Sequence, residues 1–477
     1  MKKLSLVIAL LSVTVGAWTQ SSISNVYSRL GIGLLEQPGN VNSLGMGGIS
    51  TVSFDNNALN LFNPASYSHL SRTVLQLTGK GIQSSLNNGE STTRYRGGQI
   101  QEIGLGLKKT GSPWGFAMGV TPYSAVGFNL TSTGVVNDST TVKYKNDGSG
   151  GINRFVVGVS RSFKLYKNPS QDTTLRGTAR FNSDNRWKEI KDSLELVSPK
   201  LSVGLNINYL FGSVRNERKV EYNNTRYFGT RITSRTSISD VLLEAGLHYY
   251  MPLQLTWDQK KIKSGTYLML AADYMMGSDL NSTFDELGEL YLYANARETV
   301  VDTSYQILEQ SGTFAIPQRI SLGAGIMRVG TEGRLWQYSA EYRVQDWTSF
   351  ESTFSDALGV ESLSKYQHLG FGIELTPKGS ENANNLFERT TYRIGARNTD
   401  TYVTLNGTQI NQRAISAGIS MPILASRSSS KFNFGIEYGT SGTLEGDLIK
   451  ENFVNFQIGL SLTPYFLNPW FVQRQYD

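Results

Sequence analysis

The sequence contains no cysteine, and its 477 residues include only three histidines and 12 prolines. Without cysteine the chain has no disulfide framework, no thiolate metal site and no cysteine nucleophile. The histidines, His69, His248 and His368, are too scattered for a histidine-based metal cluster. We therefore expect neither a metal nor another cofactor.

Long hydrophobic runs are also missing. Beyond the first 20 residues no stretch of about 18 apolar residues occurs, which excludes a polytopic helical membrane protein. Charged residues make up 18% of the chain, and aromatic residues, at 11%, are too frequent for a disordered protein. The formal charge of +6 comes from interspersed acids and bases, so we expect no nucleic-acid partner. Abundant glycine with low charge and a mean hydropathy of −0.27 fits strands that are apolar on one face only, as in a membrane-facing wall.

The N-terminus has the pattern of a secretory signal. Lys2 and Lys3 precede an apolar run from Leu4 to Val15, and small residues follow at Gly16 and Ala17. This apolar run is too short to span a bilayer as a stable helix. We predict that residues 1–20 are a cleaved signal peptide.

Alternation with a period of two, which is typical of β-strands, dominates the chain from about residue 72. In one clear segment Val203, Leu205 and Ile207 alternate with small or polar residues. The pattern predicts fourteen strands, with boundaries uncertain by a few residues. They cover residues 72–86, 99–109, 114–130, 151–163, 201–213, 236–251, 265–277, 316–328, 335–349, 366–377, 387–399, 410–421, 431–440 and 451–463.

A soluble sandwich or small barrel would share this alternation. Here, however, one face carries large apolar residues and the other carries Gly, Ser, Asn and Gln, which is not a second core. Segments of about 10 to 14 residues match a hydrocarbon layer, and short and long connections alternate. We predict an all-β fold, a transmembrane antiparallel β-barrel over residues 72–463 in the outer membrane. The connections at 280–315 and 351–365 are long, the charged stretch 164–200 forms a periplasmic excursion, and 464–477 forms a periplasmic tail.

Residues 21–71 differ from the wall because they are rich in glycine. Gly45, Gly47 and Gly48 lie in one short run, and the step Asn63-Pro64-Ala65 follows. Such glycines permit close backbone approach but make a poor strand. A fourteen-stranded barrel is wide enough to leak, so we predict that this segment fills the lumen as a hatch.

The chain resembles the long-chain fatty-acid transporter (FadL) family of outer-membrane barrels, in a branch common in the Bacteroidota. The similarity covers most of the mature chain, and its most specific part is the N-terminal signature. The residues that carry the resemblance are Leu44-Gly45-Met46-Gly47-Gly48, Asp55-Asn56, Asn63-Pro64-Ala65, Pro317-Gln318-Arg319 and Tyr392-Arg393-Ile394-Gly395-Ala396.

The resemblance implies fourteen strands, a hatch, and a third strand whose inward kink opens the wall sideways. The matching strand here contains Pro122, Tyr123 and Ser124, and proline inside a wall strand removes a ladder hydrogen bond. On this basis we expect Asn63, Pro64 and Ala65 to anchor the hatch against the strand around Pro122.

No enzyme motif is found, because the nucleophile elbow, phosphate-binding glycine loops and the zinc-protease helix motif are all missing. Six charged residues fall on the small, polar face of predicted strands and should point into the lumen. Their simplest role is a buried charge ladder that braces the wall, and steering of a substrate is the alternative. They are Glu341, Arg343, Glu374, Arg393, Arg397 and Glu437.

Three functions are compatible with these patterns, and a general porin is the least favoured of them. In the first, the barrel takes up small hydrophobic, fatty-acid-like molecules through the hatch and a lateral opening. In the second, it is a non-transporting scaffold or shuttle subunit of an outer-membrane export or assembly complex. The expected partners are outer-membrane lipid, a hydrophobic small molecule, and other outer-membrane or periplasmic proteins.

Overall fold

The computed structural model describes residues 25–53, 55–137, 140–165, 199–223, 227–258, 261–294, 297–354, 363–379, 382–423 and 430–463. The predicted signal peptide, most of the charged stretch 164–200 and the tail 464–477 lie outside these ranges. In the described part of the chain, no helix is long and apolar enough to cross a membrane.

Fourteen long strands form a closed ring. The sheet has 17 strands, and three of them (β1, β9 and β10) lie outside the ring, which leaves 14. Pairing of β17 with β2 and of β11 with β8 closes the ring. The ring strands are β2 (Val74–Asn87), β3 (Thr92–Leu107), β4 (Trp114–Asn137), β5 (Thr140–Lys164), β6 (Lys200–Tyr222), β7 (Gly229–Asp258), β8 (Lys261–Met275), β11 (Arg319–Val329), β12 (Leu335–Asp346), β13 (Lys365–Thr376), β14 (Thr391–Leu405), β15 (Thr408–Pro422), β16 (Lys431–Ser441) and β17 (Lys450–Leu462).

The predicted antiparallel barrel of fourteen strands is therefore confirmed, and each predicted segment overlaps one ring strand. Short helical turns lie in the connections between ring strands. They are η4 (Thr331–Gly333), η5 (Trp347–Ser349), α5 (Leu386–Arg389) and η6 (Glu445–Asp447).

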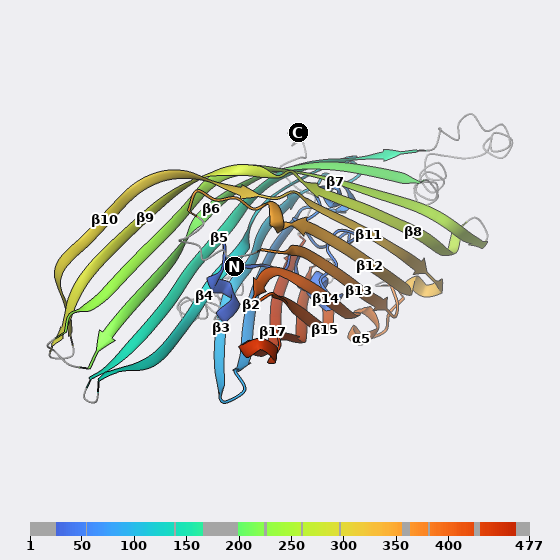
Figure 1. The fold of residues 1–477 in the computed structure, drawn as a ribbon. Coiled ribbons are helices and arrows are strands. Elements are labelled where there is room, and N and C mark those ends of the chain that lie inside the picture. The colour runs from blue at the N-terminus through green and yellow to red at the C-terminus, as the bar shows by residue number, and fades with distance from the viewer. Residues whose placement is uncertain are drawn as a thin grey trace, which may run out of the picture.

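The connection 280–315, predicted as a long loop, is instead a β-hairpin of β9 (Ser278–Ala294) and β10 (Arg297–Ile316). β9 pairs with the first part of β7, so the sheet continues beyond the ring, and Figure 1 shows these strands sweeping out to the left. β5 and β6 also extend past the predicted 151–163 and 201–213. The prediction stopped short because the apolar alternation ends where the strands leave the membrane layer, while the backbone pairing goes on.

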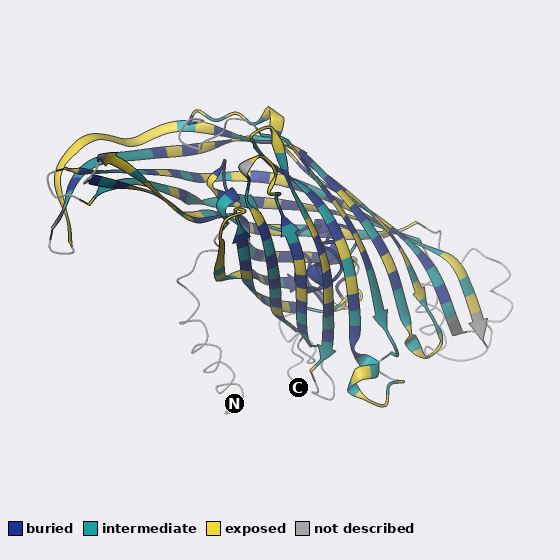
Figure 2. Cartoon of the chain, turned by 60° about the horizontal axis from the view of Figure 1, so that its bottom comes forward, coloured by how far each residue is buried: buried dark blue, intermediate teal, exposed yellow. Residues whose placement is uncertain are grey.

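The two faces of the wall differ as the alternation predicts. On β6, Leu205 and Ile207 are 59% and 55% exposed on the outside. Asn206 and Asn208, which point inward, are buried. Figure 2 shows the resulting alternation of buried and exposed residues along the strands. The outward face is an apolar surface suited to lipid.

The N-terminal segment, residues 25–70, packs against the inward face of this wall. It contains η1 (Val26–Arg29), β1 (Leu34–Leu35), α2 (Val41–Gly45) and η2 (Pro64–His69). α2 contacts β14 to β17, whereas η2 contacts β4 to β7. Because these strands belong to opposite parts of the ring, the segment lies within the lumen.

The two ends of the barrel carry different connections. One rim carries the turns at 108–113 and 330–334, and the hairpin β9–β10 extends from the other. Short turns are typical of the periplasmic side, so we assign the first as the inner rim and the second as the outer rim.

We expect Ile207→Arg to lower the free energy of unfolding by about 2–4 kcal/mol, because it places a charge against hydrocarbon in the middle of the lipid face. The measurement is a urea titration of the barrel folded in lipid vesicles.

The matched control is Val135→Arg on β4. Val135 is 74% exposed on the part of the sheet that extends beyond the outer rim, so the same change should cost almost nothing. Equal losses in the two variants would contradict the assigned membrane layer.

Candidate functional site

Asn63 ties the N-terminal segment to the wall. Its side-chain oxygen accepts a hydrogen bond from Ala65 N at 3.0 Å and caps η2. Its amide nitrogen donates to Thr51 O at 3.0 Å and to Ala272 O on β8 at 3.2 Å. Pro64 lies next to Gly246 on β7 and Gly204 on β6. These contacts of the step are with β6, β7 and β8, and its expected anchoring against the strand around Pro122 stays a prediction.

The predicted glycine run allows the backbone of the segment to touch the backbone of the wall. Gly47 and Gly48 have φ of +72° and +80°, a conformation that favours glycine. Gly47 N donates to Ser416 Oγ on β15 at 3.1 Å. On the wall, a Cβ at Gly395 would lie 2.1 Å from Gly47 N, so β14 also needs glycine there.

The carboxylate of Glu341 binds the backbone of the segment directly. It accepts hydrogen bonds from Ser50 N and Thr51 N, both at 2.7 Å. Arg343 pairs with Glu341 and donates to Ser50 Oγ at 3.0 Å. Both charged residues are only 1% exposed. Of the six predicted lumen charges, these two make the closest contact with the segment.

The remaining four predicted charges also point inward. Arg393 pairs with Glu374 at 2.6 Å and lies 3.8 Å from Asp55 of the segment. Arg397 pairs with Glu437 through two hydrogen bonds of 2.8 and 3.1 Å, which brace β14 against β16. The bracing role predicted for the charges thus coexists with attachment of the segment.

Asp55 is held as a carboxylate within the lumen. Burial alone would raise its pKa, but the nearby Lys431 and Arg393 cations outweigh burial and lower it below the ordinary value. Lys431 Nζ lies 3.5 Å from the carboxylate. The segment is therefore attached by ion pairs at Asp55 as well as through Glu341.

A second charge cluster was missed by sequence reasoning. Arg319 pairs with Asp273 at 2.9 Å and also with Glu244. Phe62 of the segment lies between two guanidinium groups, 4.2 Å from that of Arg319 and 4.6 Å from that of Arg343. The inward position of these charges follows from the period-two pattern. Their meeting does not, because Arg319 and Glu244 are 75 residues apart.

The wall is interrupted beside Pro122. The ladder between β3 and β4 has only five residue pairs and ends at Ile103 and Val120. Three residues further along, Tyr123 forms a bulge in the pairing of β4 with β5. The predicted kink residues Pro122, Tyr123 and Ser124 therefore lie where β3 has separated from β4.

Strand β1 of the N-terminal segment pairs with β4 just past this interruption. Leu34 and Leu35 pair with Ala125 and Ser124. Glu36 N donates to Tyr123 O at 3.0 Å, and the Glu36 carboxylate pairs with Lys80 at 2.7 Å. The same segment that fills the lumen thus completes the edge of β4.

A small cavity with several charged residues in its lining lies between β1, Phe62 and this part of the wall. Its volume is about 40 Å³, which is room for a few water molecules. Its lining includes Glu36, Glu102, Pro122, Arg154, Arg319 and Arg343.

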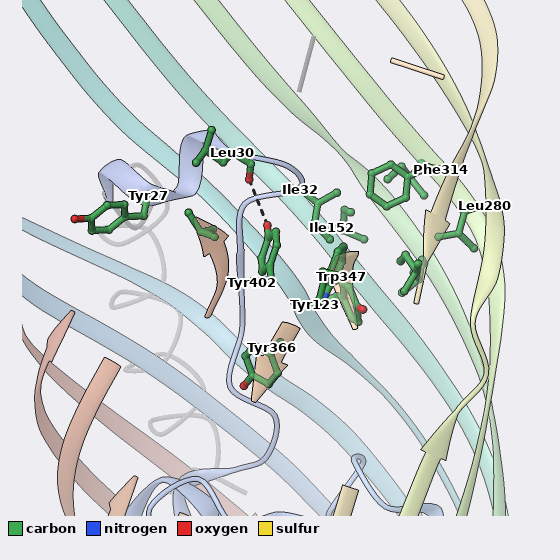
Figure 3. Packing of buried hydrophobic residues seen from close by; sticks show 14 of the residues in the cluster. Tyr27, Leu30, Ile32, Tyr123, Ile152, Leu280, Phe314, Trp347, Tyr366 and Tyr402 are labelled. Carbon is green, nitrogen blue, oxygen red and sulfur yellow. Dashed lines mark hydrogen bonds between the residues drawn. The ribbon is translucent and has the colours of Figure 1, made fainter. Parts of the chain in front are cut away.

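Toward the outer rim the lumen becomes apolar. Tyr27, Leu30 and Ile32 of the segment pack with Trp347 and Tyr402 of the wall end, as Figure 3 shows. The rings of Trp347 and Tyr402 stack at 4.6 Å, and Tyr402 OH donates to Leu30 O at 3.3 Å. Charged residues border this apolar cluster directly, since Arg319 is paired with Met275, a member of the cluster.

We expect Glu341→Gln to lower the free energy of unfolding by about 3–5 kcal/mol, because it leaves Arg343 buried without its carboxylate. Urea titration followed by tryptophan fluorescence measures this loss.

Glu298→Gln provides the comparison, since it removes a partly exposed carboxylate that lies 3.1 Å from Lys219 and from Arg231. Its cost should be about 1 kcal/mol or less. A loss at Glu341 no larger than at Glu298 would rule out the proposed anchoring.

Comparison with known proteins agrees with the architecture. The toluene transporter TbuX of Ralstonia pickettii superposes with a TM-score of 0.50 at 12% identity, covering 90% of this chain and 98% of that chain. The toluene transporter TodX of P. putida gives a TM-score of 0.50 at 13% identity, covering 90% and 99%. A Pseudomonas aeruginosa FadL homologue gives 0.47 at 11% identity, covering 91% and 99%. No curated protein gives a significant sequence match.

The fold is therefore that of FadL-type barrels, as the sequence resemblance indicated, and this fold is characteristic of bacterial outer-membrane proteins. At the level of sequence, the profile of the family described as BamG matches residues 1–170 and 193–477. Since that match covers nearly the whole chain, the protein belongs to the BamG family.

Proposed function

We propose that this barrel takes up small hydrophobic molecules across the outer membrane, with the N-terminal segment as a hatch and the interruption beside Pro122 as a lateral exit. The observation that carries the proposal is the five-pair ladder between β3 and β4, which ends next to the lumen cavity. A wall strand that loses its neighbour in the membrane layer gives a solute a sideways path into lipid.

The chemistry of the lumen fits such a path. A hydrophobic solute would first meet the apolar cluster around Tyr27, Trp347 and Tyr402 at the outer rim. The charges of Arg319 and Arg343, which border this cluster, disfavour further travel along the barrel axis, because desolvating ion pairs is costly. Beside the cluster, β4 is half-buried at Pro122 and Ala125 and leads to the lipid.

Passage requires movement of the segment, since the cavity holds only a few water molecules. β1 is the natural moving part because it is only two residues long and lies directly at the interruption, where it pairs with β4 through Leu34 and Leu35. Asn63 and the backbone at Ser50 and Thr51 are held by hydrogen bonds to β8 and β12 instead. We propose that residues 31–36 shift while the rest of the hatch stays fixed.

The size class of the solute is also part of the proposal. Two of the proteins named above are toluene transporters, and this chain shares only their fold. Monoaromatic hydrocarbons are the first probes to use, and fatty acids are the second.

The test is deletion of Tyr123, the bulge residue. Without it β4 can pair regularly with β5, which should close the interruption and abolish uptake of radiolabelled toluene by cells that carry the barrel. Fast migration of the unheated protein on a semi-native gel checks that the variant is folded.

Two further variants isolate the bulge. Tyr123→Ala keeps the bulge and removes the side chain, so uptake should persist. Deletion of Val136 removes a second irregularity of β4, between Val135 and Asn137 and away from the proposed exit, and should also leave uptake intact. A folded Tyr123 deletion that takes up toluene at the unaltered rate would refute the lateral route.

A second candidate function is a scaffold subunit of an outer-membrane export or assembly complex. The densely packed lumen supports it, as does the hairpin β9–β10, which extends from the outer rim with residues 297–311 exposed. Phe284 and Gln310 are paired, so residues 285–309 can be replaced by a short turn that leaves Leu280 and Phe314 of the apolar cluster in place. A scaffold should lose its co-purifying outer-membrane partners in mild detergent after this change, while toluene uptake stays the same.

A further inference from the structure

A hollow of about 500 Å³ lies on the outside of the barrel at the inner rim, beside the turn between β3 and β4. Leu107, Trp114 and Phe116 give it an apolar floor, and Lys108, Lys109 and Ser112 line its remaining sides. Trp114 and Phe116 are 43% and 51% exposed. An apolar hollow that opens toward lipid and is rimmed by lysine has the composition of an interface site.

Arg161 on β5 adds a second cation to this place. It is paired with Trp114 across the strands, and its guanidinium lies 5.1 Å from the Trp114 ring and 4.9 Å from the Phe163 ring. Because the guanidinium stacks on two aromatic rings, its plane is fixed, and the N–H groups at its edge remain free to bind a ligand. Lys109 is exposed, whereas Lys108 turns inward and donates to Ser68 O at 2.7 Å.

The charge of this sector is of one sign. The wall segments 103–121, 155–165 and 199–205 contain no Asp or Glu. Neither Lys109 nor Arg161 forms an ion pair with a carboxylate among the residues that the structure describes. Elsewhere on the same rim the cation Lys378 lies 3.4 Å from Glu388 and 3.9 Å from Glu332. Within the described residues, Lys109 and Arg161 thus lack the acidic partners that Lys378 has on the same rim.

An apolar strip leads from the hollow into the membrane layer. Leu107 pairs with Phe116, Leu105 pairs with Met118, and Ile103 pairs with Val120. Phe116, Met118 and Ile103 are exposed on the outer face. This strip follows the whole of the five-pair ladder between β3 and β4, so a chain lying on it would cover the shortest ladder of the ring.

We propose that this place binds one anionic phospholipid. Lys109 and Arg161 hold the phosphate group, Trp114 and Ser112 border the glycerol region, and one acyl chain lies along Phe116 and Met118. The occupant is a lipid because the cations border an apolar surface that is continuous with the membrane-facing wall, which a soluble anion would leave uncovered. The site does not depend on the proposed transport.

The experiment uses the full-length barrel in vesicles of equal parts phosphatidylethanolamine and phosphatidylglycerol. Native mass spectrometry after gentle release counts the lipid of each kind that remains bound. The unaltered protein should retain phosphatidylglycerol in preference to phosphatidylethanolamine. The double variant Lys109→Gln with Arg161→Gln should lose that preference by about tenfold, since each basic side chain near an anionic lipid strengthens binding severalfold.

Two matched variants make the outcome specific. Lys143→Gln with Arg235→Gln removes the same charge from exposed positions on the extended sheet beyond the outer rim and should retain the preference. Lys109→Arg with Arg161→Lys keeps both charges and should also retain it, which separates charge from folding. Equal retention of the two lipids by the unaltered protein would overturn the proposal, as would equal losses in the two charge-removing variants.

Discussion

A backbone segment enclosed by a β-barrel must pair each polar group that its own short helical turns leave unpaired, and the inner face of the wall supplies many of the partners. Glu341 supplies the central partner, since its carboxylate accepts from Ser50 N and Thr51 N. A buried carboxylate needs a cation of its own, and Arg343 provides it. Arg343 in turn stacks on Phe62, which places the apolar part of the segment next to the charges.

The glycine content of the wall is a consequence of the same enclosure. A Cβ at Gly204 would lie 2.4 Å from the carbonyl carbon of Pro64, and one at Gly395 would overlap Gly47 N. Backbone therefore meets backbone at several points of the ring, which leaves little room for side chains between segment and wall. This close approach explains why the lumen of a fourteen-stranded ring contains so little free space along the segment.

The sequence predicted the ring well because burial on one side and lipid on the other impose a strict period of two on each strand. Alternation at residues 201–209 was sufficient to place β6 in the wall. The extension beyond the rim was missed because water lies on both sides of β10, which removes the apolar face that marks a membrane strand.

The inward charges could be predicted singly but not as pairs. Arg319, Glu244 and Asp273 come from three different strands, and only the register of the closed ring brings them together. The position of Asn63 shows the same limit. The hydrogen bond by which Asn63 caps η2 is local and can be predicted from the Asn-Pro step. Its contact with Ala272 depends on the path of the whole segment through the barrel.

The edge of β4 links the state of the lumen to the state of the wall. β3 separates from β4 after Val120, and the edge next carries bonds from Glu36 N to Tyr123 O and from Ser124 Oγ to Ile32 O. Unpaired backbone groups at membrane depth are costly unless water or protein satisfies them. If residues 31–36 move away, the N–H and C=O groups of β4 at 123–125 must therefore pair with β3 or be hydrated from the lumen. Either outcome would change the wall at the same place where the segment had moved, so under the proposed route the filling of the lumen and the pairing of the β4 edge are coupled.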